Sequence, residues 1–231
     1  MIKALIFDFD GLIVDTETPA LESWRRIYAE HGFDLELEVW AGALGTNHGF
    51  NALEHLTNLV AGVDGARAAA LRAEAAAVLA RRQELKAQLS ASQGILPGVM
   101  AVLDQADALG MPCAVASSSG YSWVGGWLER LGILGRFRCV RTGDDVERTK
   151  PDPALFLSAA ACLGVPPAAC LVLEDSPNGI LAARAAGCPV IAVPGALTSK
   201  LALPPADLVV PSLDAMSLSA MIAAVEAARA G

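Results

Sequence analysis

Short apolar runs alternate with longer amphipathic stretches along most of the chain. The apolar runs span three to six residues and are typical of buried strands; they lie at Ala4–Phe9, Cys113–Ala116, Cys139–Arg141, Cys170–Leu173, Val190–Val193 and Leu208–Val210. Helical periodicity occupies the stretches between them, near 98–109, 122–132, 153–164, 177–187 and 216–229. Strands of continuous hydrophobicity that alternate with helices predict an α/β fold, with a parallel sheet core covered by helices on both faces.

One segment breaks this alternation. Residues 16–92 show helical periodicity and no strand pattern, and the clearest predicted helix covers 65–90. The chain returns to the sheet through "SQGILPGV", which is marked by glycine and proline. We therefore predict a core domain of residues 1–15 and 93–231, and an all-helical cap domain of residues 16–92 inserted after the first strand. Ligands bind beyond the carboxyl ends of parallel strands, so an insert at this point would cover the binding crevice.

Composition narrows the class of protein and its partners. The chain is 54% hydrophobic and 18% charged, as expected of a globular protein. Its apolar runs are too short to cross a membrane, and "MIKALIFDFDG" turns acidic too early for a signal peptide, so we expect a cytoplasmic protein with no membrane partner. The net charge of −8 argues against a nucleic-acid partner. A monomer is the default expectation.

The cysteines and histidines give no sign of a metal site. The five cysteines form no CxxC pair and lie mostly among apolar residues, so we expect small buried side chains and no disulfide. The three histidines lack the spacing of a zinc site.

Polar residues gather where the predicted strands end or the following helices begin. They are Asp8 and Asp10 after the first strand, Ser117 and Ser118 after the second, Lys150 before a helix, and Glu174 and Asp175 after the fourth. In a parallel sheet these positions converge at one edge. Each cluster alone would fit a helix cap or a turn, but their joint order favours a site for a divalent cation and a phosphoryl group.

Each residue type has a chemical use at such a site. A carboxylate can attack phosphorus to form an aspartyl-phosphate, and a neighbouring carboxylic acid can protonate the leaving alcohol. Mg²⁺ prefers carboxylate oxygens and can bridge to a phosphate. A lysine and hydroxyl groups can bind the phosphate oxygens.

The segments "DFDGLIVDTE", "SSSG", "KPDP" and "EDSPNGILAARAAG" resemble the four motifs of the haloacid dehalogenase superfamily. More narrowly, they resemble its helical-capped branch of sugar-phosphate phosphatases and β-phosphoglucomutase. The resemblance covers nearly the whole chain and implies a Rossmann-like core and a phosphoric monoester hydrolase. The expected substrate is a small phosphorylated metabolite, such as a sugar or polyol phosphate.

The resemblance also implies a role for each motif residue. Asp8 would be the nucleophile and Asp10 the general acid and base, while Ser117, Ser118 and Lys150 would bind the phosphoryl group. The cofactor would be Mg²⁺, held by the side chains of Asp8 and Asp175, by the backbone carbonyl of Asp10, and by Glu174 directly or through water.

Two alternatives stay open at this stage. A phosphoglucomutase-like activity is disfavoured because Ala20, Gly120 and "GTNHGF" replace a histidine, a lysine and an arginine-bearing loop of the mutases. A phospho-aspartate switch without turnover would have no reason to keep Asp10 or a helical lid.

Substrate choice is expected to lie in the cap. The loop "LGTNHGF", residues 44–50, makes Thr46, Asn47 and His48 candidate substrate contacts, although a solvated loop with a helix cap explains it equally well. Trp24, Trp123 and Trp127 are interpreted as packing residues.

Overall fold

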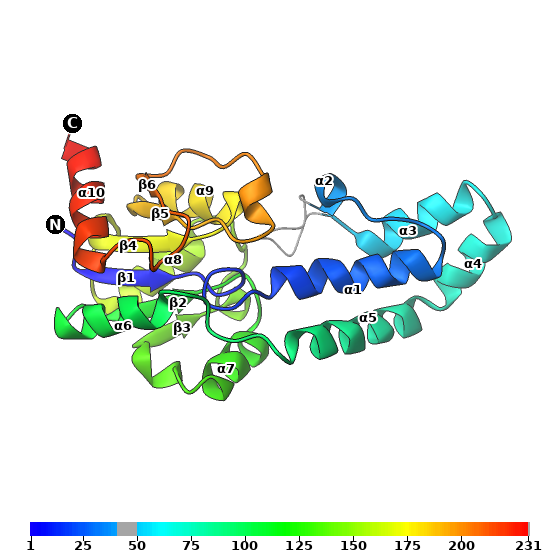
Figure 1. Cartoon of the computed structure of the whole chain (residues 1–231), viewed down its shortest axis with the longest axis horizontal. Coiled ribbons are helices and arrows are strands. Elements are labelled where there is room, and N and C mark those ends of the chain that lie inside the picture. Colours follow the sequence, from blue (N-terminus) through cyan, green and yellow to red (C-terminus); the bar gives the residue numbers. More distant parts are fainter. Residues whose placement is uncertain (41–49, 231) are drawn as a thin grey trace. The chain divides into compact units, whose positions relative to one another are not determined.

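The computed structural model describes residues 1–40 and 50–230. Over these residues the chain divides into two compact units, drawn in Figure 1. We call residues 1–15 and 94–230 the sheet unit, and residues 16–40 and 50–93 the helical unit.

Six parallel strands form one sheet within the described residues, in the order β3-β2-β1-β4-β5-β6. Their bounds are β1 Ala4–Phe7, β2 Cys113–Ala116, β3 Cys139–Arg141, β4 Cys170–Glu174, β5 Val190–Ala192 and β6 Leu208–Val209. Phe7 of β1 lies opposite Val115 on one side and Leu173 on the other. The chain adds strands first on one side of β1 and then on the other, so the carboxyl end of β1 lies where the strand order reverses. Ligands bind at this point in open α/β sheets.

Helices cover both faces of the sheet (Figure 1). Their bounds are α6 Val99–Ala108, α7 Tyr121–Arg130, α8 Ala154–Leu163, α9 Pro177–Ala185 and α10 Leu218–Ala230. Leu5 and Phe7 of β1 pack with the apolar faces of α6, α7 and α10. Ala4 and Ile6 point the other way and pack with α8 and α9. Successive strand residues face opposite sides, so an uninterrupted apolar run is what a sheet covered twice requires. The predicted α/β fold is confirmed.

The helical unit consists of helices and contains no strand among its described residues. The helices are α1 Glu17–Glu30, α2 Leu37–Trp40, α3 Ala52–Ala61, α4 Gly65–Ala73 and α5 Ala75–Ser90. The single helix predicted over 65–90 is wrong, because the chain breaks at Glu74 into α4 and α5. The two pieces have different partners: α4 packs on α3, whereas α5 packs on α1. A straight helix could not serve both.

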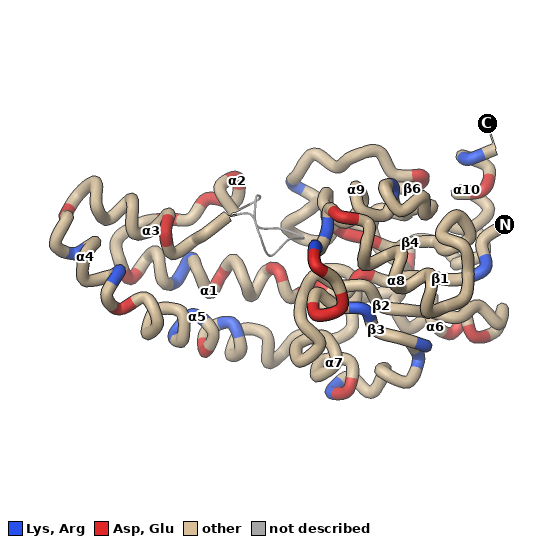
Figure 2. Tube along the Cα trace, turned by 180° about the vertical axis from the view of Figure 1, so that it is seen from behind, with Lys and Arg blue, Asp and Glu red and all other residues tan. Residues whose placement is uncertain are grey.

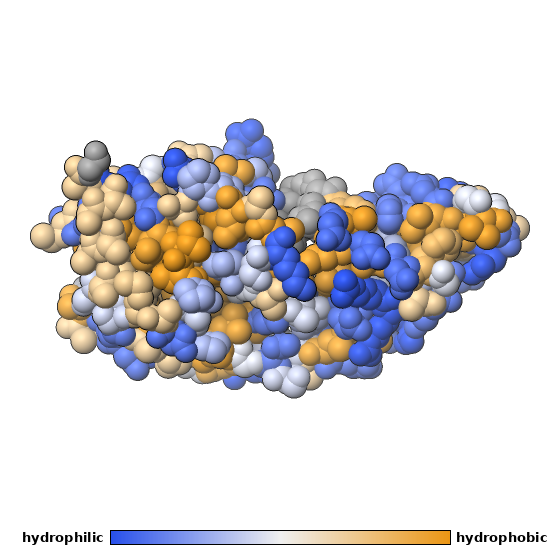
Figure 3. Space-filling model, turned by 45° about the horizontal axis from the view of Figure 1, so that its top comes forward, coloured by the Kyte–Doolittle hydropathy of each residue, from blue (hydrophilic) through white to orange (hydrophobic). Residues whose placement is uncertain are grey.

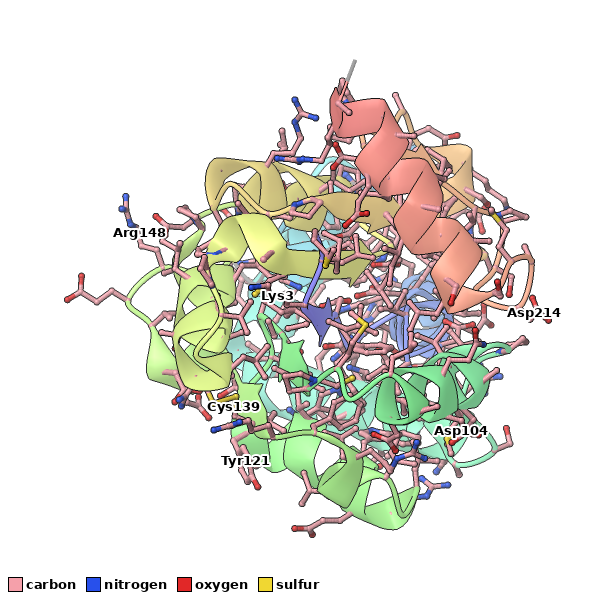
Figure 4. The ribbon with its side chains drawn as sticks, turned by 90° about the vertical axis from the view of Figure 1, so that its left-hand side faces the viewer. Lys3, Asp104, Tyr121, Cys139, Arg148 and Asp214 are labelled. Atoms are coloured by element: carbon pink, nitrogen blue, oxygen red, sulfur yellow. A yellow bond between two sulfur atoms is a disulfide. The ribbon has the colours of Figure 1, made fainter. Side chains whose placement is uncertain are left out.

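One pair of cysteines differs from the prediction. Cys139 of β3 and Cys162 of α8 form a disulfide, seen near the labelled Cys139 in Figure 4. The expectation of no disulfide is therefore wrong: the two residues are 23 positions apart and meet only because α8 packs beside β3. The other three cysteines, Cys113, Cys170 and Cys188, are buried free thiols, as predicted.

The surface carries both apolar and polar residues. Figure 3 shows apolar side chains gathered over part of the sheet unit on the face it draws, among hydrophilic ones. No helix in the described part of the chain combines the length and the apolar character needed to cross a bilayer.

Candidate active site

Strand β1 delivers two aspartates to the carboxyl edge of the sheet. Asp8 follows the strand directly, and its N–H donates to the Leu173 carbonyl of β4 at 3.0 Å. The chain then turns sharply, with the Gly11 N–H donating to the Val14 carbonyl at 2.8 Å. Gly11 has φ of +89°, and a Cβ there would overlap the Asp175 carboxylate. Only glycine satisfies both demands at this turn.

Lys150 lies between two buried carboxylates. Its Nζ donates to Asp8 Oδ1 at 2.5 Å and to Glu174 Oε1 at 2.7 Å. Lys150 is 2% exposed and Glu174 fully buried, so these are contacts in a largely water-free environment. Such a buried charge network is retained only where its members neutralise one another or serve chemistry.

Glu174, the last residue of β4, is fixed from its other oxygen as well. Oε2 accepts hydrogen bonds from the Ser176 backbone N–H at 2.8 Å and from the Ser176 hydroxyl at 3.0 Å. A Cβ at Gly179, in the first turn of α9, would overlap the Glu174 carboxylate. The start of α9 therefore fixes the Glu174 carboxylate, and Glu174 in turn orients Lys150.

Burial and neighbouring charges shift the pKa values of Asp8 and Lys150. Burial raises the pKa of Asp8 well above that of an ordinary carboxyl; Glu174 and Asp10 raise it further, and Lys150 offsets only part of the effect. Burial opposes the charge on Lys150, but the attraction of Asp8 and Glu174 outweighs it and raises the pKa of Lys150 above its usual value. The shift therefore favours the charged form of Lys150, and further positive charge nearby would lower the pKa of Asp8.

Three carboxylates form a cluster that could hold a cation. One oxygen each from Asp8, Glu174 and Asp175 lies within 4.8 Å of the others, and all three residues are buried. Asp175 Oδ2 also accepts a hydrogen bond from the Thr198 hydroxyl at 3.4 Å. A set of hard oxygen ligands of this kind suits Mg²⁺.

Asp10 has a separate set of partners, two serines on the turn after β2 and a tryptophan in the first turn of α7. Its Oδ2 accepts hydrogen bonds from the hydroxyls of Ser117 at 3.0 Å and Ser119 at 2.7 Å. Its Oδ1 accepts one from the Trp123 indole N–H at 2.9 Å. The two aspartates of "DFD" are therefore held by different groups, Asp8 by a lysine and Asp10 by neutral donors.

The predicted core residues do come together. Asp8, Lys150, Glu174 and Asp175 form one buried group, and Asp10 and Ser117 meet beside it. Ser118 is half-buried on the turn between the two serines that bond Asp10. The cap candidates Thr46, Asn47 and His48 lie outside the described residues.

Several polar contacts were not anticipated. Ser119, Trp123, Ser176 and Thr198 all bond a predicted site residue. Ser119 and Ser176 lie within the quoted motifs and could have been included among the site residues. Trp123 was interpreted as a packing residue, and that interpretation is incomplete. No local pattern distinguishes an indole that bonds a carboxylate from one that only packs.

Comparison with known proteins agrees with this geometry. A family model described as haloacid dehalogenase-like hydrolase matches residues 2–187. The putative phosphatase YhcW of Bacillus subtilis is 43% identical over 222 residues, which cover 96% of this chain and 97% of that protein. Hexitol phosphatase A of Escherichia coli is 34% identical over 218 residues, 94% of each chain.

A solved structure supports the same assignment. CbbY of Rhodobacter sphaeroides, crystallised in complex with phosphate, is 26% identical and superposes with a TM-score of 0.65, covering 95% of this chain and 98% of that one. The predictions of family, of an α/β fold and of a phosphoric monoester hydrolase are confirmed at this level. A family match over most of the chain and phosphatase relatives of nearly equal length lead to one conclusion: the chain belongs to the haloacid dehalogenase-like hydrolases.

Proposed function

We propose that the protein is a Mg²⁺-dependent phosphatase that hydrolyses a sugar or polyol phosphate through an aspartyl-phosphate on Asp8. The observation that best supports this is the buried contact of Asp8 with Lys150, beside a carboxylate cluster and next to Asp10. A nucleophile, a cation-binding group and an acid are then available at the carboxyl edge of the sheet, where β1 and β4 end. The sheet unit supplies this chemistry, and the helical unit serves as the cap.

The carboxylate cluster fits Mg²⁺. Asp8, Glu174 and Asp175 offer hard oxygens close together, and Asp10 would add its backbone carbonyl. Bound Mg²⁺ would supply positive charge that offsets the repulsion between Asp8 and the substrate phosphate. Burial opposes the ionised form of Asp8 and so raises its pKa, and additional positive charge would favour that ionised form.

The first step transfers the phosphoryl group to the protein. An oxygen of Asp8 forms a bond to phosphorus while the bond from phosphorus to the alcohol oxygen breaks. Protonated Asp10 gives its proton to the departing alcohol oxygen. Lys150 and the hydroxyls of Ser117 and Ser118 hold the phosphate oxygens during the transfer.

The second step returns the protein to its starting state. Asp10, now a carboxylate, takes a proton from water as the water oxygen attacks phosphorus. The bond between phosphorus and Asp8 breaks, and inorganic phosphate leaves. Asp10 ends protonated and Asp8 ends ionised, so both are ready for a second substrate molecule.

The substrate class is proposed from the relatives. A hexitol phosphatase with 34% identity over 94% of both chains favours a polyol or sugar phosphate. Thr46, Asn47 and His48 remain candidate substrate contacts. A monomer, a cytoplasmic location and the absence of a nucleic-acid or membrane partner stay predictions.

The mutase alternative has little support at Gly120. A side chain there would begin 3.2 Å from the Asp144 carboxylate oxygens, and glycine itself offers no cation for a second phosphate. Phosphate release distinguishes hydrolysis from isomerisation, and turnover distinguishes both from a phospho-aspartate switch.

A panel of sugar, polyol and small-acid phosphates, assayed with millimolar Mg²⁺ and with EDTA, tests the proposal. We expect inorganic phosphate from a polyol or sugar phosphate, together with loss of activity in EDTA and recovery on adding Mg²⁺. Full activity in EDTA would refute the metal requirement. Conversion of β-glucose 1-phosphate to the 6-phosphate without phosphate release would establish the mutase instead.

A further inference from the structure

The carboxylate of Asp10 is bound by three donors from one short segment. Ser117, Ser119 and Trp123 lie within seven consecutive residues and reach both of its oxygens. Ser117 is buried, while Asp10, Ser119 and Trp123 are half-buried. The segment that follows β2 therefore fixes the plane of the carboxylate as well as its position.

Local structure holds the Trp123 indole in place. The backbone N–H of Trp123 donates to the Gly120 carbonyl at 3.1 Å, in the first turn of α7. Its ring meets the Trp127 ring edge to face, with centroids 5.8 Å apart. Arg130 lies over the Trp127 ring, 4.6 Å from its centroid. The indole N–H thus donates to Asp10 from a side chain whose ring packs against Trp127.

The three donors have different duties when a phosphate is bound. A serine hydroxyl has one proton to donate, so Ser117 cannot bond Asp10 and a phosphate oxygen with it at the same time. Under the proposed function Ser117 turns to the phosphate. Asp10 then keeps only Ser119 and Trp123 of these three partners. An indole nitrogen is a donor only, and that of Trp123 already donates to Asp10 Oδ1 at 2.9 Å.

We propose that Trp123, together with Ser119, is a positioning residue that keeps Asp10 aimed at the leaving oxygen while Ser117 binds the phosphate. This inference rests on the proposed function, since it assigns Trp123 a role only if Asp10 is the acid. Neither residue touches the reacting atoms. Their contribution is orientation, to which rates are sensitive: a misplacement of about 1 Å can cost roughly a hundredfold.

The test compares two probes that differ in their need for an acid. Phenyl phosphate releases a basic phenolate that benefits from protonation, whereas p-nitrophenyl phosphate releases a stable anion. With enzyme in excess and Mg²⁺ present, the release of the phenol in a single turnover reports the first step alone. We expect Trp123→Phe, which keeps an aromatic ring beside Trp127, to slow the phenyl phosphate reaction about tenfold and the p-nitrophenyl reaction by less than about twofold.

Ser119 provides an independent pair of variants. Ser119→Ala should show the same selective loss, and Ser119→Thr, which restores a hydroxyl, should recover most of the phenyl phosphate rate. Ser122 is exposed in α7, next to Trp123, and is the matched control, so Ser122→Ala should leave both rates unchanged. Equal slowing of both probes by Trp123→Phe, or no slowing of either, would overturn the positioning role.

Asp10→Asn separates this inference from the function on which it rests. If Asp10→Asn slows phenyl phosphate selectively and Trp123→Phe and Ser119→Ala do not, the positioning role is wrong and the proposed function stands. If Asp10→Asn shows no selectivity between the probes, Asp10 is not the acid and both proposals fail.

Discussion

The two units differ most in the polar groups that they bury. Among the described residues the buried charges all lie in the sheet unit: Asp8, Lys150, Glu174 and Asp175. Among its described residues, the polar side chains that the helical unit buries carry no charge; they include those of Thr16, Ser23, Thr57 and Ser90. Two of these donate to carbonyls of the same or the preceding turn, Ser23 to Ala20 and Thr57 to Leu53, each at 2.7 Å.

The charged residues of the helical unit that the structure describes are half-buried or exposed. Figure 2 shows lysine, arginine, aspartate and glutamate spread along its helices. Its ion pair between Arg81 and Glu30 joins side chains that are each about half exposed, 55% and 44%. Exposed pairs contribute little to stability, whereas unpaired buried charges are costly. The sheet unit therefore carries a cost that the helical unit avoids, and catalysis explains why it is kept.

The largest effect should come from removing the nucleophile. We expect Asp8→Asn to lower kcat by at least about 10⁴-fold, because the attacking oxygen is lost while its surroundings remain. Steady-state phosphate release measures the change. Asp34→Asn, at an exposed position of the helical unit, is the matched control and should leave kcat within about twofold of the wild type. Comparable losses in the two variants would remove the functional distinction between the units.

Breaking the buried pair should destabilise the fold as well as the reaction. Lys150→Met leaves Asp8 and Glu174 buried without their cation, so we expect the free energy of unfolding to fall by about 3–5 kcal/mol. Denaturant unfolding of wild type and variant gives this difference. Arg81→Met breaks the exposed pair of the helical unit, and its unfolding midpoint should stay close to that of the wild type. A Lys150→Met protein as stable as the wild type would mean that the buried charges are not coupled as the contacts indicate.

The disulfide should stabilise the edge of the sheet. Cys139 and Cys162 close a loop over a separation of 23 residues, and loss of such a link costs about 3 kcal/mol in the chain-entropy model. The double variant Cys139→Ser, Cys162→Ser should unfold at lower denaturant than the oxidised wild type. In the presence of a reductant, the wild type should unfold at the same denaturant concentration as the double variant. If reductant leaves the wild type unchanged, the bond does not form in solution.

Magnesium should stabilise the protein in a manner that depends on pH. Because the pKa of Asp8 is raised, the folded protein binds this proton more tightly than the unfolded chain does. Without metal, the free energy of unfolding therefore falls as the pH rises from the carboxyl pKa of the unfolded chain toward the raised pKa of the folded protein. Mg²⁺ competes with that proton and should stabilise more at pH 8 than at pH 5. At a hundred times its dissociation constant the gain is about 2.7 kcal/mol.

Thermal unfolding with and without Mg²⁺ at the two pH values checks this prediction. Asp175→Asn should weaken the Mg²⁺-dependent shift, while Asp34→Asn should retain it. A shift of equal size at both pH values would show that Asp8 does not exchange its proton for the metal.

The sequence predicted the site through the geometry of parallel sheets. Asp8, Ser117 and Glu174 are distant in the chain, but each ends or follows a strand, and the ends of parallel strands share one edge. The bond between Trp123 and Asp10 could not be predicted in this way, because it depends on the rotamer of a side chain six residues beyond Ser117. The break at Glu74 and the pairing of Cys139 with Cys162 depend on which elements pack together, which local periodicity does not record.

Gly11 and Gly179 have a consequence for how far the sequence can vary. Each faces one of the acidic ligand candidates so closely that a methyl group would overlap it, Gly11 at Asp175 and Gly179 at Glu174. In a library of random substitutions, these two glycines should therefore tolerate change as poorly as the carboxylates, although they have no functional groups. Selection for hydrolysis would preserve the space around the acids together with the acids themselves.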